Sequence, residues 1–225
     1  MKLTQNLYAY VWKGSDNNCN SYIFGNVLRG NKHLIIDPGH IVTPYLGEPA
    51  YETLAKAILQ DGLKLEDIGL VALTHAHPDH VEAARIFKEK YQAKIAINQE
   101  DAGILRRFGG DKVDCFIEEG PMKCDNLIQD RLEIFKVPGH SPGHIAIYWP
   151  AQKALAVGDV IFFRNTGRVD LPGGNAAEMH KSIQKLSRLD AEYVLCGHPY
   201  GHPGVIQGKN AVQENFTFLL DNLPF

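Results

Sequence analysis

Thr74-His75-Ala76-His77-Pro78-Asp79-His80 is the stretch that decides the fold of this chain, because it places three histidines and one aspartate within six residues. A continuous apolar run, residues 68–73, precedes it, and a segment with apolar residues at helical spacing, residues 81–91, follows it. We therefore expect the stretch to lie at the turn between a buried strand and a helix. Such a density of histidine is hard to attribute to packing.

The residue types in this stretch are those of a metal site. Imidazole nitrogen and carboxylate oxygen are ligands that suit zinc, iron and manganese. Residues two apart on an extended backbone point the same way, so His75 and His77 can share one ion. Pro78 interrupts the strand, and the turn that it begins can direct Asp79 and His80 toward a second, adjacent ion.

The same context recurs three times later in the chain. His140, Asp159 and His198 each follow a glycine at the end of an apolar run. Glycine before a ligand permits a close approach or an unusual backbone dihedral angle. The sequence therefore offers seven candidate metal ligands: His75, His77, Asp79, His80, His140, Asp159 and His198.

Composition narrows the class of protein. The chain has 225 residues, a formal net charge of −3 and no basic tract that would follow a phosphate backbone, so nucleic acid is not an expected partner. No apolar run reaches membrane-spanning length and the N-terminus lacks a signal-like apolar region, so we expect a cytoplasmic protein without a membrane partner. Four cysteines without a Cys-x-x-Cys pair argue against a disulfide framework, and most are expected to be reduced core residues.

Alternating strand and helix patterns run through the whole chain without a linker or a repeat, which favours one layered α/β domain. Strands are predicted at residues 7–12, 21–24, 34–36, 68–73, 94–97, 132–137, 145–149, 154–157 and 193–196. Helices are predicted at residues 51–59, 81–91, 101–107 and 176–189.

The His-x-His-x-Asp-His run, preceded by Ile35-Ile36-Asp37-Pro38-Gly39 and followed by His140, Asp159 and His198, resembles the metallo-β-lactamase superfamily. The resemblance implies an αββα four-layer sandwich with the metals at one edge. It implies a single domain over residues 1–225, because too few residues follow His198 for the helical glutathione-binding domain of the longer glyoxalase II enzymes.

Ligand roles follow from this resemblance. His75, His77 and His140 are expected at the first ion, Asp79, His80 and His198 at the second, and Asp159 between them. Asp37 is expected to support a ligand histidine rather than to bind metal, and Thr74 to act similarly. Asp79 is also the expected catalytic residue that orients the attacking oxygen.

Residues 158–174 resemble the small bacterial glyoxalase II-like, or hydroxyacylglutathione hydrolase-like, enzymes. That resemblance implies cleavage of an S-2-hydroxyacylglutathione thioester by a metal-bridging hydroxide, with two divalent ions, zinc before iron or manganese. The expected partner is therefore a small glutathione-derived thioester, and Arg168 is the expected contact for a substrate carboxylate. The oligomeric state stays open.

Two alternatives use the same residues. A persulfide dioxygenase would hold one iron with His75, His140 and Asp159, and a lactone or other ester hydrolase would use the same metal centre. His40 and His144 flank the motifs and could be supporting, substrate-facing or surface groups. Glu82 is expected to be a solvated charge on a helix surface.

Overall fold

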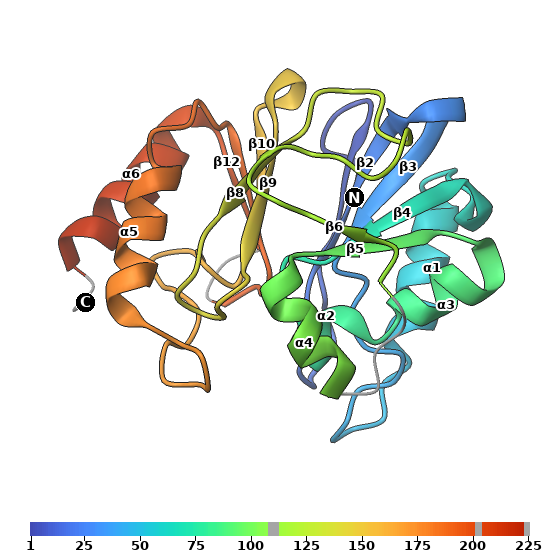
Figure 1. The fold of residues 1–225 in the computed structure, drawn as a ribbon, viewed down its shortest axis with the longest axis horizontal. Coiled ribbons are helices and arrows are strands. Elements are labelled where there is room, and N and C mark those ends of the chain that lie inside the picture. Colours follow the sequence, from blue (N-terminus) through green and yellow to red (C-terminus); the bar gives the residue numbers. More distant parts are fainter. Residues whose placement is uncertain (108–112, 201–203, 223–225) are drawn as a thin grey trace.

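Two six-stranded sheets lie face to face between two layers of helices in the computed structural model (Figure 1). The structure describes residues 1–107, 113–200 and 204–222. One apolar core fills the space between the sheets, and one more separates each sheet from its helices. This arrangement confirms the predicted αββα sandwich.

The first sheet has the strand order β1-β2-β3-β4-β5-β6. Its strands are β1 (Leu7–Tyr10), β2 (Ser21–Leu28), β3 (Lys32–Ile36), β4 (Ile68–Ala72), β5 (Lys94–Ile97) and β6 (Cys115–Phe116). β3 to β6 run parallel, which requires crossover connections, and helices supply them. These helices are α1 (Ala50–Gln60), α2 (Pro78–Val81), α3 (Ala84–Tyr91) and α4 (Gln99–Arg107).

The second sheet has the order β12-β11-β10-β9-β8-β7 and is antiparallel except between β10 and β11. Its strands are β7 (Gly120–Pro121), β8 (Glu133–Lys136), β9 (Ile145–Trp149), β10 (Ala154–Gly158), β11 (Tyr193–Cys196) and β12 (Val205–Gln207). Helices α5 (Ala176–Leu186) and α6 (Lys209–Asn222) cover its outer face (Figure 1). Within the described residues, no helix is both long enough and apolar enough to cross a bilayer.

Side chains of β4 alternate between two apolar cores, which explains why its sequence is a continuous apolar run. Leu70 and Ala72 point into the core between the sheets, whereas Val71 and the following Leu73 point toward the helices. Both faces of the strand are therefore buried, as expected for a central parallel strand. Phe24 and Trp149 join the two sheets through rings whose centroids lie 5.0 Å apart.

Several elements differ from the sequence prediction. The predicted helix over residues 81–91 is divided, because α2 ends at Val81 and α3 begins at Ala84. β6, β7, β12 and α6 were not predicted. The three strands are two or three residues long, too short to display a period of two. The buried stripe of α6 includes the polar Asn215, which weakens its apolar pattern.

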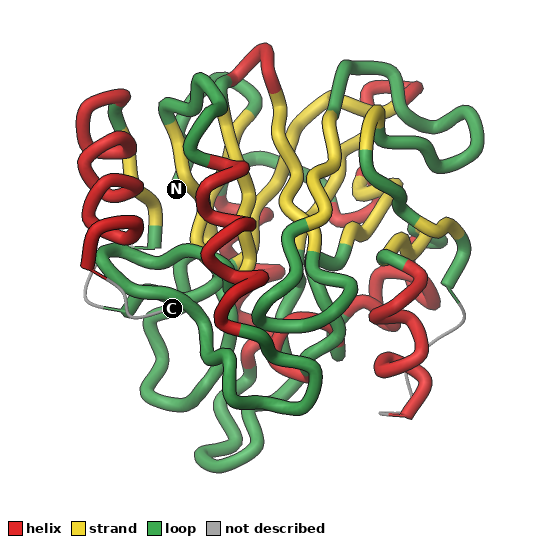
Figure 2. The backbone as a smooth tube through the Cα atoms, turned by 60° about the vertical axis from the view of Figure 1, so that its left-hand side comes forward, coloured by secondary structure: helices red, strands yellow, loops and turns green. Residues whose placement is uncertain are grey.

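Long loops gather at one end of the two sheets (Figure 2). β3 and β4 of the first sheet and β10 and β11 of the second lead into the segments that carry Asp37, His75, Asp159 and His198. The sandwich thereby brings candidate ligands from distant parts of the chain to one edge.

Phe24→Ala tests the core between the sheets. Removing the fully buried ring leaves a cavity against Trp149, so we expect the free energy of unfolding to fall by about 3–5 kcal/mol in a urea titration. Tyr45→Ala is the control, because that side chain is 84% exposed and its loss should change stability by less than about 0.5 kcal/mol. Equal effects of the two substitutions would contradict this account of the core.

Candidate metal centre

Three histidines from the two sheets meet at this edge. His75 and His77 follow β4 of the first sheet, and His140 follows β8 of the second. His77 Nδ1 lies 3.0 Å from His75 Nε2 and 2.8 Å from His140 Nε2. His75 and His140 are buried and His77 is partly buried. We call these three residues the first cluster.

Hydrogen bonds at the Nδ1 atoms orient the rings of His75 and His140. His75 Nδ1 donates to the Thr74 hydroxyl (3.0 Å), because that hydroxyl itself donates to a carboxylate. His140 Nδ1 donates to the backbone carbonyl of Arg168 (2.8 Å). These contacts direct the Nε2 atoms of His75 and His140 at His77 Nδ1, which can donate to only one of them.

Protonation of His75 or His77 does not supply the missing hydrogen-bond donor. Burial lowers the pKa of His75 well below its ordinary value and that of His77 to about 4, so both rings are neutral near pH 7. Neutral imidazoles whose lone pairs converge on one point are the ligand set that a divalent cation requires. The first cluster thus fits a metal ion.

Asp79, His80 and His198 form a second cluster beside the first. His80 Nε2 lies 3.4 Å from His198 Nε2, and His198 Nε2 lies 3.3 Å from Asp79 Oδ2. In each cluster the ligand atoms all lie within 4.8 Å of one another. Burial alone would lower the pKa of His198, but the charges and hydrogen bonds of Asp159 and Asp79 raise it to about 9. The second cluster therefore carries carboxylate charge, whereas His75 and His77 of the first cluster are neutral rings.

Asp159 lies between the clusters. Its Oδ2 atom is 3.5 Å from His140 Nε2 and 3.5 Å from His198 Nε2, and its Oδ1 atom is 3.3 Å from His80 Nε2. Oδ1 is buried without a well-formed hydrogen bond. A buried carboxylate oxygen normally has a full set of partners, so this carboxylate also fits a cation that both clusters approach.

Asp37 supports the ligands through hydrogen bonds. Its Oδ1 accepts from the backbone N–H of Thr74 (2.8 Å), and its Oδ2 accepts from the Thr74 hydroxyl (2.6 Å) and from His80 Nδ1 (2.9 Å). Asp37, His75 and His80 also lie close enough to form a ligand group. Because both Asp37 oxygens already accept hydrogen bonds, the geometry favours a supporting role, and it leaves His80 Nε2 directed toward Asp159.

All three glycines that precede candidate ligands are required by close contacts. A Cβ atom on Gly139 would lie 2.5 Å from the Cα atom of Met179. A Cβ atom on Gly158, whose φ is +48°, would lie 2.4 Å from the Thr74 hydroxyl, and one on Gly197 would lie 2.1 Å from Asp159 Oδ1. No side chain fits at either position without moving a ligand or its support. The glycines in the motifs therefore reflect the density of packing around the clusters.

Three further residues contact the site but were not identified as site residues from the sequence. Asn17 Nδ2 donates to Asp79 Oδ2 (2.8 Å). His144, which the sequence left open, stacks on His75 at a centroid distance of 4.7 Å, and its Nε2 accepts from the backbone N–H of Asp159 (3.2 Å). Asp101 accepts hydrogen bonds from the loops of both sheets. Asn17 and Asp101 are single polar residues outside any motif, so no sequence signal distinguished them.

The clusters open into a cavity of about 500 Å³. Arg168 lines this cavity, yet its guanidinium is exposed and donates to both carboxylate oxygens of Asp170, at 2.9 and 2.8 Å. Tyr200 lines the cavity and stacks on His198. Glu82 is exposed, as expected for a charge on the surface, and it also pairs with the buried His40 at 2.8 Å.

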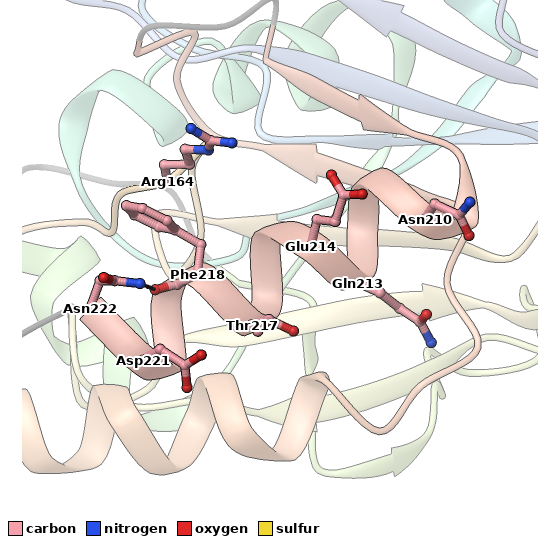
Figure 3. Close-up of a pocket in the computed structure, with 8 residues that line it drawn as sticks. All are labelled: Arg164, Asn210, Gln213, Glu214, Thr217, Phe218, Asp221 and Asn222. Atoms are coloured by element: carbon pink, nitrogen blue, oxygen red, sulfur yellow. Dashed lines mark hydrogen bonds between the residues drawn. The ribbon is translucent and has the colours of Figure 1, made fainter.

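A second hollow lies along α6 (Figure 3). Its lining includes Arg164, Glu214 and Asp221 but no histidine or cysteine. The Arg164 guanidinium lies over the rings of Phe163 and Phe218, 5.3 Å from each centroid. The hollow therefore lacks the ligand types of the metal centre.

The cysteines depart in part from expectation. Cys115 in β6 and Cys124, which follows β7, form a disulfide, whereas the cysteine spacing argued against a disulfide framework and most cysteines were expected to be reduced. The disulfide links β6, an edge strand of the first sheet, to the segment after β7, an edge strand of the second sheet. The spacing of the two cysteines in the sequence does not reveal that they lie close together. Cys19 and Cys196 are free and buried, and burial raises the pKa of the Cys19 thiol to about 12.

Known proteins resemble this chain in sequence and in fold. The family model of the metallo-beta-lactamase superfamily matches residues 14–198. A hydroxyacylglutathione hydrolase, GloC, from Haemophilus influenzae is 33% identical, with 73% of this chain and 78% of that protein covered. A hydroxyacylglutathione hydrolase from Mesorhizobium japonicum is 29% identical over 74% of this chain, which spans only 61% of that protein.

A solved structure of TTHA1623 in a di-iron-bound form is also similar. It superposes with a TM-score of 0.65 at 28% identity and covers 84% of this chain and 91% of that one.

Protonation of His198 gives a test of the second cluster. Because its pKa is about 9, the ring carries a proton at pH 7, and a metal ligand must be neutral. The pKa of His80 is also raised well above its ordinary value, because Cys19, Asp159 and Asp37 outweigh the effect of burial. We expect zinc binding at pH 7 to release protons from both histidines and zinc affinity to rise as the pH approaches 9. Calorimetric titration in buffers of different ionisation enthalpy measures the release, and His198→Ala should reduce it. Equal heats in all buffers would contradict the assignment.

Proposed function

Because the chain belongs to the metallo-beta-lactamase superfamily, we propose that it is a dinuclear metallohydrolase that cleaves a thioester of the S-2-hydroxyacylglutathione type. The observation that carries the proposal is the position of Asp159 between two clusters of ligand type. His75, His77 and His140 would hold one divalent ion and Asp79, His80 and His198 the other. Asp159 would contribute to both.

Divalent ions at these clusters would lower the pKa of a water ligand toward neutrality and polarise the substrate carbonyl. The chain's own residues orient the reacting groups. Asp79 lines the cavity, and its Oδ2 atom is held by Asn17, so the carboxylate can orient the attacking water and accept its proton. Hydrogen bonds from Thr74 and His80 to Asp37 keep the ligand rings in the required tautomers.

The proposed reaction is a hydrolysis. The water oxygen forms a bond to the acyl carbon, the bond from that carbon to sulfur breaks, and the thiol leaves with a proton. The products are a 2-hydroxy acid and glutathione. No oxidant or further reactant is needed.

Three observations support a thioester as the substrate. The cavity of about 500 Å³ is of the size that holds a small molecule. Two relatives at about 30% identity are hydroxyacylglutathione hydrolases. Arg168 stands at the cavity with a guanidinium that can pair with a substrate carboxylate.

Metal analysis and a thioester assay test the proposal together. We expect about two divalent ions per chain, with zinc favoured over iron and manganese, and hydrolysis of S-lactoylglutathione that disappears with chelation and returns with added metal. One iron per chain with oxygen consumption on glutathione persulfide would instead indicate a dioxygenase. Two ions with turnover of lactones or simple esters but not of thioesters would keep the metal centre and reject the substrate.

The pair formed by Arg168 and Asp170 allows a sharper test of substrate binding. Arg168→Ala removes the guanidinium but keeps the backbone carbonyl that His140 contacts, so KM should rise about three- to tenfold with kcat nearly unchanged. Asp170→Asn is the matched variant. It removes the competing carboxylate, so it should lower KM in the same steady-state assay. An unchanged KM in both variants would exclude Arg168 from substrate binding.

A further inference from the structure

Asp101 is a completely buried carboxylate that touches the ligand-bearing loops but belongs to neither cluster. It is the third residue of α4. A buried charge is costly unless hydrogen bonds compensate it, so its partners indicate what the residue does.

Those partners come from both sheets. Asp101 Oδ2 accepts from the backbone N–H of Ala76 (3.0 Å) and from the Ser141 hydroxyl (2.8 Å), and Oδ1 accepts from the backbone N–H of Gly143 (2.7 Å). Ala76 lies between the ligands His75 and His77 in the loop after β4. Ser141 and Gly143 follow the ligand His140 in the loop before β9. One side chain therefore links the two loops that supply the first cluster.

The packing around Gly143 shows that this link is tight. A Cβ atom on Gly143 would lie 2.6 Å from the backbone nitrogen of Asp101 and 2.7 Å from its Oδ1 atom. The start of α4 is itself fixed by Asn98, whose Nδ2 donates to the Ile117 carbonyl (2.9 Å). The Asp101 side chain is thus held in a fixed position. At position 143, no residue larger than glycine would allow this close contact with Asp101.

We infer that Asp101 is a positioning residue that sets the separation of His75 and His77 from His140 and thereby the metal affinity of the first cluster. The inference rests on the proposed function, because it requires that this cluster hold an ion. The Nδ1 atom of His77 and the Nε2 atom of His140 belong to different sheets and lie 2.8 Å apart. Another hydrogen bond between these loops, from Ile145 N–H to the Thr74 carbonyl (2.9 Å), meets the first loop just before His75 and the second just after His144. Asp101 meets the first loop between His75 and His77 and the second directly after His140.

Asp101→Asn tests the inference. The amide is nearly isosteric, but its nitrogen cannot accept, so either orientation leaves a backbone N–H of Ala76 or Gly143 facing a donor. We expect the zinc affinity of the first cluster to fall about tenfold or more, as for other residues that orient metal ligands. Chelator competition should be measured in a His198→Ala background, in which the second cluster is impaired and the first can be followed.

Asp114→Asn is the matched control. Asp114 also accepts a backbone N–H, from Ile95 (2.9 Å), and pairs with Lys88 (2.7 Å), but it contacts no ligand-bearing loop. Thermal unfolding of each metal-free variant separates a local effect from general loss of structure. If Asp101→Asn does not fold, Ser141→Ala removes one of the same hydrogen bonds and should weaken zinc binding by about threefold.

The outcomes are distinct. Weakened zinc binding in Asp101→Asn, with Asp114→Asn unchanged and the unfolding temperatures of the metal-free variants similar, supports the inference. Unchanged affinity in Asp101→Asn, or an equal loss in Asp114→Asn, overturns it. If the unsubstituted chain itself binds no zinc, the proposed function fails instead.

Discussion

The convergence of ligand atoms on the Asp159 carboxylate is the constraint on which the rest of the structure depends. A scaffold must hold these groups together, because buried ring nitrogens and carboxylates are costly to remove from water even where protonated His198 pairs with Asp79 and Asp159. The core between the sheets does this, because it fixes β4 and β10, which lead to His75 and Asp159, in two sheets that cannot separate without exposing apolar surface. The packing that stabilises the sandwich consequently also assembles the site.

Backbone conformation at the edge shows how closely the elements must approach. Asp37 has a positive φ of 48°, which is unfavourable for a residue with a side chain, and it is held there by hydrogen bonds to Thr74 and His80. Gly158 and Gly197 leave room for Thr74 and Asp159 respectively. At these three positions, the backbone conformation or the absence of a side chain leaves a candidate ligand or its supporting residue in place.

Sequence patterns predicted the layers and the strand ends at which the candidate ligands come together, but not the residues that link those ends. Histidines spaced two apart after an apolar run, and ligand types after glycine, are local patterns that a single segment displays. Asp101 carries no such pattern, because an acidic residue in the first turn of a helix is common for reasons of helix electrostatics alone. The disulfide from Cys115 to Cys124 and the pair formed by His40 and Glu82 depend on tertiary contacts that spacing does not encode.

The two clusters are chemically unequal, and the inequality follows from their surroundings. The first consists of three imidazoles that donate their other protons or pack in a buried setting, which keeps the pKa values of His75 and His77 low. The second contains Asp79, and the nearby carboxylates raise the pKa of His198 to about 9. A cation at the first cluster would therefore meet two ligands, His75 and His77, that need not lose a proton. A cation at the second must displace protons from His80 and His198 but gains carboxylate charge. Asp159 contacts residues of both clusters. An ion bound at one cluster would therefore change the negative charge that Asp159 offers to an ion at the other.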